Sequence, residues 1–303
     1  MELLNYDMVV EMARKLPKKG MVAVASAADA HVIEATLEAR EKGVAEPIYV
    51  GDAEKIRAIL REMGLNPSDF NIENTAAGMN DAETAVELVK NGSASFLMKG
   101  MLETSDMLRP VVKKENNLRT GRAMSHLSFN KFDAYHKVIC STDGGMNTYP
   151  DLERKKDILH NAIDAFHKLG YELPKAGILC CKETYDEKIK DTVEARRLQE
   201  MAEAGEFGKC AVVGPISYDI AFNAEIAKIK HFDCPYCGNF DIVMGPDIHS
   251  NNLFSKVWVQ HCGAVMAGMI VGAKVPIVLS SRGASAQEKY LSLTLASVIA
   301  SAC

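Results

Sequence analysis

Short apolar runs alternate with longer amphipathic segments through the first half of the chain, and this alternation restricts the possible folds more than any other feature. The runs at 21–25, 47–50 and 95–98 have the length and aliphatic content of buried strands. Helix-like segments separate them and end near glycines, for example Gly43 and Gly64. Strands and helices that alternate at this spacing are typical of a doubly wound parallel sheet. The sequence therefore predicts an α/β fold.

A second α/β domain is predicted after about residue 127. The strand at 138–142 runs into the glycine-rich turn 143–147, and an amphipathic helix follows over 151–169. Further buried strands are predicted at 176–181, 211–213 and 241–244.

Length and composition exclude several classes of protein. The 303 residues are 48% hydrophobic and 25% charged, enough for two α/β domains or one large one. No run of about 18 apolar residues indicates a membrane span, and the N-terminus lacks the pattern of a signal peptide. Eight cysteines without a secretory signal favour reduced thiols and a cytoplasmic location. The net charge of -5 argues against nucleic acid as the main partner.

The stretch from Val271 to Lys289 is the strongest candidate for a ligand site. A buried strand is predicted over 275–279 and a helix over 285–303, with the polar turn 280–283 between them. A turn that opens a helix presents unpaired backbone N–H groups and the positive end of the helix dipole, which suit an anion. Arg282 adds a planar guanidinium that matches phosphate or carboxylate.

The same stretch has a purely structural interpretation. Ser285 and Glu288 fit a capping box, in which the serine caps the helix and the glutamate bonds back to the first N–H group. Taken alone, this role is favoured for Glu288, and the turn before it can be an ordinary solvated one.

Two basic residues follow the strand at 95–98. Lys99 stands at its carboxyl end and Arg109 lies in the next predicted helix, so both can face a ligand. A lone lysine or arginine is more often solvated, and both interpretations stay open. No Gly-x-Gly-x-x-Gly follows any strand and no phosphate-binding P-loop occurs, which weakens a nucleotide-binding hypothesis.

Six separated motifs stand in the order found in one enzyme family. They are Met98-Lys-Gly with Thr104 to Pro110, Leu118-Arg-Thr-Gly121 with Met124-Ser-His126, Thr142-Asp-Gly-Gly-Met-Asn147, Gly214-Pro215 with Asp219, Pro246-Asp247-Ile248 with Asn252 and Lys256, and Ser281-Arg-Gly-x-Ser-x-Gln-Glu288. Together they resemble the phosphate acetyl/butyryltransferase family, with the early motifs closest to its butyryl branch. The resemblance extends from Val22 to Ala296, and Asn251 departs from it by replacing the usual glycine.

The resemblance implies an architecture. It suggests two doubly wound α/β domains with an interdomain cleft, similar to isocitrate and isopropylmalate dehydrogenases. The first domain would comprise residues 1–129 with 268–303, and the second would comprise 130–267. The C-terminal helix would return to the first domain, and a homodimer or higher homo-oligomer is expected from the family.

The resemblance also implies an activity, the transfer of a short acyl group between coenzyme A and inorganic phosphate. Phosphate would attack butyryl-CoA directly while both substrates are bound, without a metal or an organic cofactor beyond CoA as substrate. Arg282 would hold phosphate, Ser281 would donate to the carbonyl oxygen or the sulfur, and Glu288 matches a carboxylate that acts as base in the acetyl branch. Residues expected to bind substrate are Lys99, Thr104, Arg109, Ser125, His126, Asp143 and Asn252.

Three alternatives stay open at this point. One is a phosphate acetyltransferase, which differs only in the preferred acyl group. Another is a metal-dependent dehydrogenase of similar two-domain fold, although the sequence shows neither a metal ligand set nor a nicotinamide motif. The third is a module that binds acyl-CoA or phosphate without turnover.

Cys234-Pro-Tyr-Cys237 is a candidate for a separate redox or metal site. The spacing is that of redox-active dithiols, but it occurs late in the chain and outside the strand–helix context in which they function. His231 and the two cysteines provide only three of the four ligands of a structural zinc site. A structural loop is favoured, and both cysteines are expected to be dispensable for catalysis.

Overall fold

The computed structural model describes residues 1–75, 78–279 and 283–303, which form two compact units. The first unit comprises Tyr6–Arg122 and Ala267–Cys303, and the second comprises Met1–Asn5 and Ala123–Met266. Both are built from strands and helices, so the α/β fold predicted from the sequence is confirmed. The predicted domain limits stay a prediction, and the two units differ from them at residues 1–5, 123–129 and 267.

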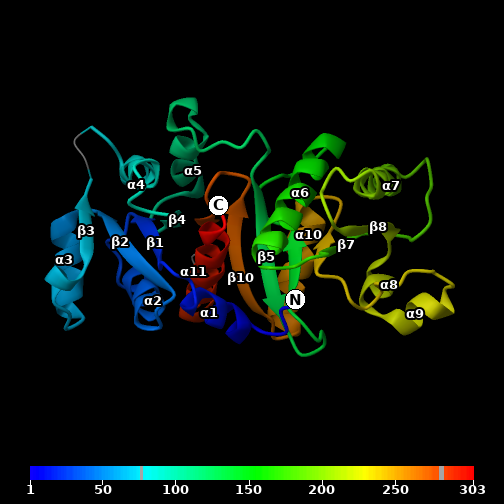
Figure 1. The fold of residues 1–303 in the computed structure, drawn as a ribbon, viewed down its shortest axis with the longest axis horizontal. Helices are drawn as coiled ribbons and strands as arrows, with labels where there is room; N and C mark the ends of the chain where they lie inside the picture. The colour runs from blue at the N-terminus through cyan, green and yellow to red at the C-terminus, as the bar shows by residue number, and fades with distance from the viewer. Residues whose placement is uncertain (76–77, 280–282) are drawn as a thin grey trace. The chain divides into compact units, whose positions relative to one another are not determined.

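The first unit contains a mostly parallel sheet with the strand order β3-β2-β1-β4-β11 (Figure 1). Its strands are β1 (Gly20–Ala25), β2 (Ala45–Gly51), β3 (Asn71–Asn74), β4 (Phe96–Lys99) and β11 (Ile277–Val278), with β10 (Val265–Val271) antiparallel to β11. The chain proceeds from β1 outwards to β2 and β3 and then returns to β4 on the other side of β1. The direction of winding therefore reverses between β1 and β4, and open α/β sheets bind ligands at the carboxyl ends of the strands at such a point.

Helices cover this sheet, and none of the helices in the described part of the chain is long and apolar enough to cross a membrane. They are α1 (Tyr6–Arg14), α2 (Ala30–Glu41), α3 (Ala53–Glu62), α4 (Asp81–Lys90), α5 (Thr104–Val112) and α11 (Ala286–Ser301). The C-terminal helix α11 packs against α1, α2 and β1, as the red and blue ribbons of Figure 1 show. Every residue from Tyr290 to Ala300 is buried, whereas the sequence pattern indicated only one apolar face.

The close packing of α11 depends on small residues. A Cβ atom at Gly20 would lie 2.5 Å from the Ser297 hydroxyl, so the start of β1 accepts no side chain. The Ser297 hydroxyl donates a hydrogen bond to the Val44 carbonyl at 2.8 Å, and the Ser292 hydroxyl accepts one from the Gly268 N–H at 2.9 Å. Buried hydroxyls that are hydrogen-bonded avoid a desolvation cost of about 1–3 kcal/mol each. The middle of α11 is therefore held firmly in place.

In the second unit the strand order is β5-β6-β9-β7-β8. Its strands are β5 (Ser125–Lys131), β6 (Ile139–Thr142), β7 (Lys175–Leu179), β8 (Ala211–Ile216) and β9 (Ile242–Met244), and its helices are α6 (Leu152–Lys168), α7 (Lys190–Glu203), α8 (Tyr218–Phe222), α9 (Ala224–Ile229) and α10 (Ile248–His261). Only the pair β5 and β6 is antiparallel. An aromatic cluster that includes Phe132, Phe240 and Trp258 fills one side of this unit.

Candidate active site

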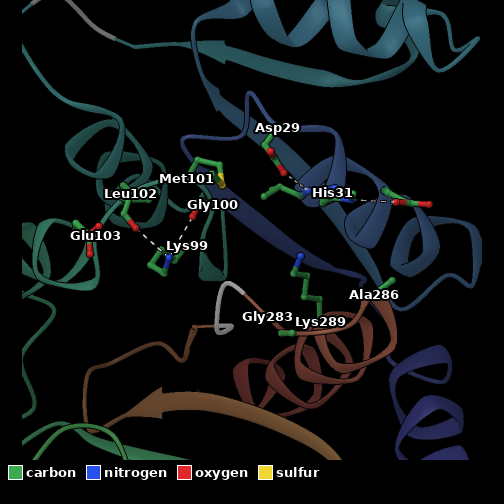
Figure 2. A pocket seen from close by; sticks show the side chains of 13 residues that line it. Asp29, His31, Lys99, Gly100, Met101, Leu102, Glu103, Gly283, Ala286 and Lys289 are labelled. Carbon is green, nitrogen blue, oxygen red and sulfur yellow. Dashed lines mark hydrogen bonds and ion pairs between the residues drawn. The ribbon is translucent and has the colours of Figure 1, made fainter.

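A cavity of about 680 Å³ lies in the first unit, at the carboxyl ends of β1 and β4. Its wall contains residues that follow β1, including Asp29 and His31, and residues that follow β4, from Lys99 to Glu103. The start of α11 closes it with Gly283, Ala286 and Lys289 (Figure 2). The volume falls in the range of about 300–1,000 Å³ that is usual for small-molecule sites. The reversal of winding in the sheet and the position of the cavity therefore indicate the same ligand site.

The loop after β4 is fixed by backbone contacts with the end of β1. The Gly100 N–H donates to the Ala25 carbonyl at 2.8 Å, and the Met101 N–H donates to the Ser26 carbonyl at 3.0 Å. A Cβ atom at Gly100 would lie 2.3 Å from the Ser26 oxygen and 2.6 Å from the Ala25 oxygen. Only glycine permits this close approach, so Gly100 determines the shape of the cavity floor.

Lys99 holds the same loop from inside. Its ammonium donates to the carbonyls of Gly100 at 3.3 Å and Leu102 at 3.0 Å, the dashed lines of Figure 2. The predicted substrate-binding role of Lys99 is compatible with its place in the cavity wall but stays a prediction.

Three helix N-termini surround the cavity. Asp29 caps α2 and accepts a hydrogen bond from the Val32 N–H at 3.0 Å, while Glu103 stands at the N-cap of α5 and Ala286 begins α11. Helix N-termini carry partial positive charge and favour anions. Their partial charges favour an anion, whereas the carboxylates of Asp29, Glu34 and Glu103 in the same wall oppose one.

Lys289 adds a full positive charge to this wall. Its side chain extends from α11 into the cavity in Figure 2 and is half-buried. Its ammonium makes no hydrogen bond or ion pair with any residue in 1–75, 78–279 or 283–303. Sequence reasoning missed Lys289, Asp29 and His31. Their position in the first turns of helices that follow strands β1 and β11 is the pattern that could have found them.

The predicted residues Thr104 and Arg109 lie on α5 of the same unit. Thr104 is the first residue of this helix, and Arg109 pairs with Asp106 at 3.2 Å on an exposed face. Neither is among the described residues that line the cavity.

Glu288 forms the capping box that the sequence indicated. Its carboxylate accepts a hydrogen bond from the Ser285 N–H at 2.7 Å, and the Ser285 hydroxyl accepts one from the Glu288 N–H at 3.1 Å. The capping role is confirmed, and its role as a base stays a prediction. The predicted catalytic residues Ser281 and Arg282 lie outside the described residues.

Three other predicted residues meet at the turn after β6 in the second unit. The carboxylate of Asp143 is almost fully buried and accepts hydrogen bonds from the N–H groups of Gly145 and Met146, both at 2.9 Å, and of Asn147 at 3.2 Å. The Asn147 side chain adds a fourth at 2.6 Å. The carboxylate of Asp143 is thus hydrogen-bonded by donors of its own turn.

His126 and Asn252 pack around this turn. A Cβ atom at Gly145 would lie 3.1 Å from the His126 ring, and Asn252 donates to the Gly144 carbonyl at 2.9 Å. Burial lowers the pKa of His126, with the Asp143 charge opposing the shift, so the ring is held in its neutral form.

Ser125 is fully buried and accepts a hydrogen bond from Asn161 at 3.0 Å. The structure therefore brings His126, Asp143 and Asn252 together, whereas the hydroxyl of Ser125 is bonded to α6 instead. Lys99 lies apart from them, in the wall of the first-unit cavity. The start of α11, the helix that contains Glu288, forms another part of that wall. The binding roles proposed for them stay predictions.

Residues 74–297 match the phosphate acetyl/butaryl transferase family. The chain belongs to this family. The resemblance predicted from the six motifs is therefore confirmed.

Relatives in both branches of the family cover nearly the whole chain. A phosphate butyryltransferase of Clostridium acetobutylicum is 36% identical over 294 residues, 97% of each chain. A phosphate acetyltransferase of Thermotoga maritima is 35% identical over 297 residues, 97% of this chain and 99% of the relative. The family's acyltransferases are thus similar to this chain at comparable identity.

A solved phosphotransacylase has a similar fold. The branched-chain phosphotransacylase of Enterococcus faecalis superposes with a TM-score of 0.80 at 27% identity and covers 93% of this chain and 99% of its own. A 4-hydroxythreonine-4-phosphate dehydrogenase of Salmonella typhimurium, at 12% identity and a TM-score of 0.58, shares only the fold. Within the described residues, no group of three or more His, Cys, Asp or Glu side chains is placed to hold a metal ion. The family and the relatives named above are phosphate acyltransferases, so the dehydrogenase alternative is not favoured.

Proposed function

We propose that the protein transfers a short-chain acyl group between coenzyme A and inorganic phosphate, with butyryl-CoA as the preferred substrate. Its membership of the phosphate acetyl/butyryltransferase family carries this proposal. The cavity at the carboxyl ends of β1 and β4 supports it, because three helix N-termini and Lys289 suit the phosphate groups of CoA. The acetyl group is the second candidate, since the Thermotoga maritima relative is nearly as similar.

The reaction is a direct displacement. An oxygen of orthophosphate attacks the thioester carbonyl, the carbon–sulfur bond breaks, and the products are acyl phosphate and the CoA thiolate. Both substrates are held together, so the protein contributes mainly orientation and stabilisation of charge. No metal or additional organic cofactor takes part.

Individual roles follow from the family motifs. Arg282 and Arg109 hold the phosphate with their guanidinium groups, and the Ser281 hydroxyl donates to the carbonyl oxygen or the sulfur. In the reverse direction Glu288 removes the proton of the CoA thiol, whose pKa of about 8.5 leaves only a few per cent ionised at pH 7. Lys99, Thr104, Ser125, His126, Asp143 and Asn252 bind or position the substrates. The enzyme acts in the cytoplasm as a homodimer or higher homo-oligomer.

Phosphate dependence tests this function. We expect thiol release from butyryl-CoA only when phosphate is present, with a product that hydroxylamine traps as the hydroxamate. The rate of thiol release and the hydroxamate yield are measured with butyryl-CoA and acetyl-CoA, with and without phosphate, and without any nucleotide. Equal thiol release without phosphate would indicate a thioesterase. Binding of acyl-CoA without any release would indicate the non-catalytic module.

A further inference from the structure

Cys234 and Cys237 flank a tight turn at the edge of the aromatic core of the second unit. Cys237 is buried within the cluster that contains Phe240 and Trp258, and the partly buried Cys234 packs against the same cluster. Neither residue belongs to the cavity or to the Asp143 turn. The proposed acyl transfer leaves this dithiol without a role.

Backbone hydrogen bonds fix the shape of this turn. The Gly238 N–H donates to the Ala221 carbonyl of α8 at 2.9 Å, and the Asn239 N–H donates to the Tyr236 carbonyl at 2.9 Å. The Tyr236 N–H donates to the sulfur of Cys234 at 3.4 Å. Gly238 has a φ of 75°, which a residue with a side chain rarely adopts. The sulfur of Cys234 is therefore held in place by the turn itself.

Cys234 and Cys237 lie three residues apart in this turn, and both pack against the same aromatic cluster. Burial is the main reason that the pKa of the Cys237 thiol rises to about 12, and the neighbouring Cys234 raises it further. Cys234 is the more exposed of the two. Since a thiolate is the reactive form of cysteine, Cys234 is the one that meets an external reagent.

This turn differs from the dithiol of a thioredoxin-like enzyme. There the reactive cysteine lies at a helix N-terminus, which lowers its pKa. Here the turn leads into strand β9, and burial opposes ionisation of the inner thiol. Such a pair suits slow modification of the protein better than rapid turnover of substrates.

We propose that Cys234 and Cys237 form a thiol–disulfide exchange site that reacts with small-molecule disulfides and closes to an intramolecular disulfide. The Cys234 thiolate attacks one sulfur of the small disulfide, the sulfur–sulfur bond breaks, and the first small thiol leaves. The sulfur of Cys237 then gives up its proton to solvent and attacks the sulfur of Cys234, and the second small thiol leaves. Two protein thiols are oxidised and one small disulfide is reduced to two thiols.

Burial of Cys237 favours the closed form. When the thiolate of a dithiol is stabilised, the reduced form of the pair is favoured. The most strongly oxidising disulfide proteins have such a stabilised reduced form. The environment of Cys237 provides no such stabilisation. The disulfide is therefore expected to resist reduction once it has formed. The second attack is expected to be slow because little of Cys237 is ionised, but at equilibrium the internal disulfide replaces the mixed disulfide.

Redox titration of the full-length protein tests the proposal. The protein is equilibrated in glutathione buffers of increasing disulfide content, the remaining thiols are alkylated, and the peptides are analysed by mass spectrometry. We expect the peptide with Cys234 and Cys237 to lose two hydrogen atoms without gaining glutathione. The exposed single thiol of Cys262 is the internal control and is expected to gain glutathione in the same samples.

Two single variants separate the steps. Cys237→Ala is expected to trap glutathione on Cys234, because the second attack is missing. Cys234→Ala is expected to leave Cys237 free of glutathione, because the inner thiol is buried. The double variant to serine is expected to keep the phosphate-dependent activity within about tenfold of the parent.

Several outcomes would overturn the proposal. One is that Cys234 and Cys237 both remain reduced, and are therefore alkylated, in buffers in which most of Cys262 already carries glutathione. Another is glutathione that stays on Cys234 in the parent protein, which would mean that the two sulfurs do not close. A third is the absence of a trapped adduct in folded Cys237→Ala.

Discussion

The cavity of the first unit and the turn after β6 in the second unit both contain residues of the family motifs, but they use polar groups in opposite ways. In the cavity, the ammonium of Lys289 extends into open space without a partner in the described parts of the chain. In the turn, the carboxylate of Asp143 is buried and accepts four hydrogen bonds from its own segment. A charged residue within a motif can therefore either bind a ligand or support the scaffold, and the donors around it distinguish the two roles.

The largest expected effect concerns Glu288, because it combines both roles. Glu288→Gln keeps an oxygen that can accept from the Ser285 N–H but removes the base. We expect nearly unchanged thermal melting and a rate from acyl phosphate plus CoA that falls at least about a hundredfold. The loss should shrink as the pH rises toward the pKa of the CoA thiol, because solvent then provides the thiolate.

The contrary result for this variant is a lower melting temperature with normal turnover. The capping box would then be the whole function of Glu288. Ser285→Ala is the matched control, since it removes the other half of the box and should cost about 1 kcal/mol of stability with little effect on the rate.

Gly100→Ala is expected to distort the cavity floor. The added Cβ would overlap backbone oxygens of β1, which cannot move as a flexible side chain does. Displacement of the loop by about 1 Å can reduce a rate about a hundredfold. We expect kcat/KM to fall by about ten- to a hundredfold in protein that remains folded. Gly92→Ala controls for lost stability, because its φ of 79° strains an alanine outside the cavity, and its kcat/KM should change little.

Asp143→Asn tests whether the carboxylate of Asp143 stabilises the fold of its turn. The amide presents N–H donors to backbone N–H groups and leaves some of them unsatisfied, at a cost of about 1–3 kcal/mol. We expect a clear decrease in melting temperature and a change in kcat/KM of less than about tenfold well below that temperature. The exposed Asp133→Asn is the control. A large loss of kcat/KM with unchanged melting would show that Asp143 contacts substrate directly.

Much of the fold followed from local patterns in the sequence. The alternation of strands and helices predicts the α/β class, and the Ser285 to Glu288 spacing predicts the capping box that the structure contains. Lys99 was found because the last residue of a parallel strand faces the ligand edge of the sheet. These inferences depend on interactions between residues that are close together in the sequence, so the local sequence pattern is enough to predict them.

Other features depend on contacts between distant segments. The cavity requires β1 to pair with β4, which places Asp29 near Lys99 although 70 residues separate them in sequence. The burial of α11 on all sides depends on α1 and α2, which no periodicity within α11 reveals. Burial of Asp143 likewise depends on how its turn packs. Sequence spacing alone could therefore not separate binding residues from scaffold residues.

The central claim is that the cavity at the carboxyl ends of β1 and β4 binds the anionic part of CoA, and Lys289 tests it most directly. The measurement is calorimetric titration of CoA into Lys289→Met, with Lys289→Arg and the exposed Lys55→Met of the same unit as controls. We predict that the Kd rises about tenfold in Lys289→Met, equivalent to ~1.4 kcal/mol, and is largely restored in Lys289→Arg. The difference should decrease at high salt. An unchanged Kd in folded Lys289→Met would contradict the assignment of this cavity to CoA.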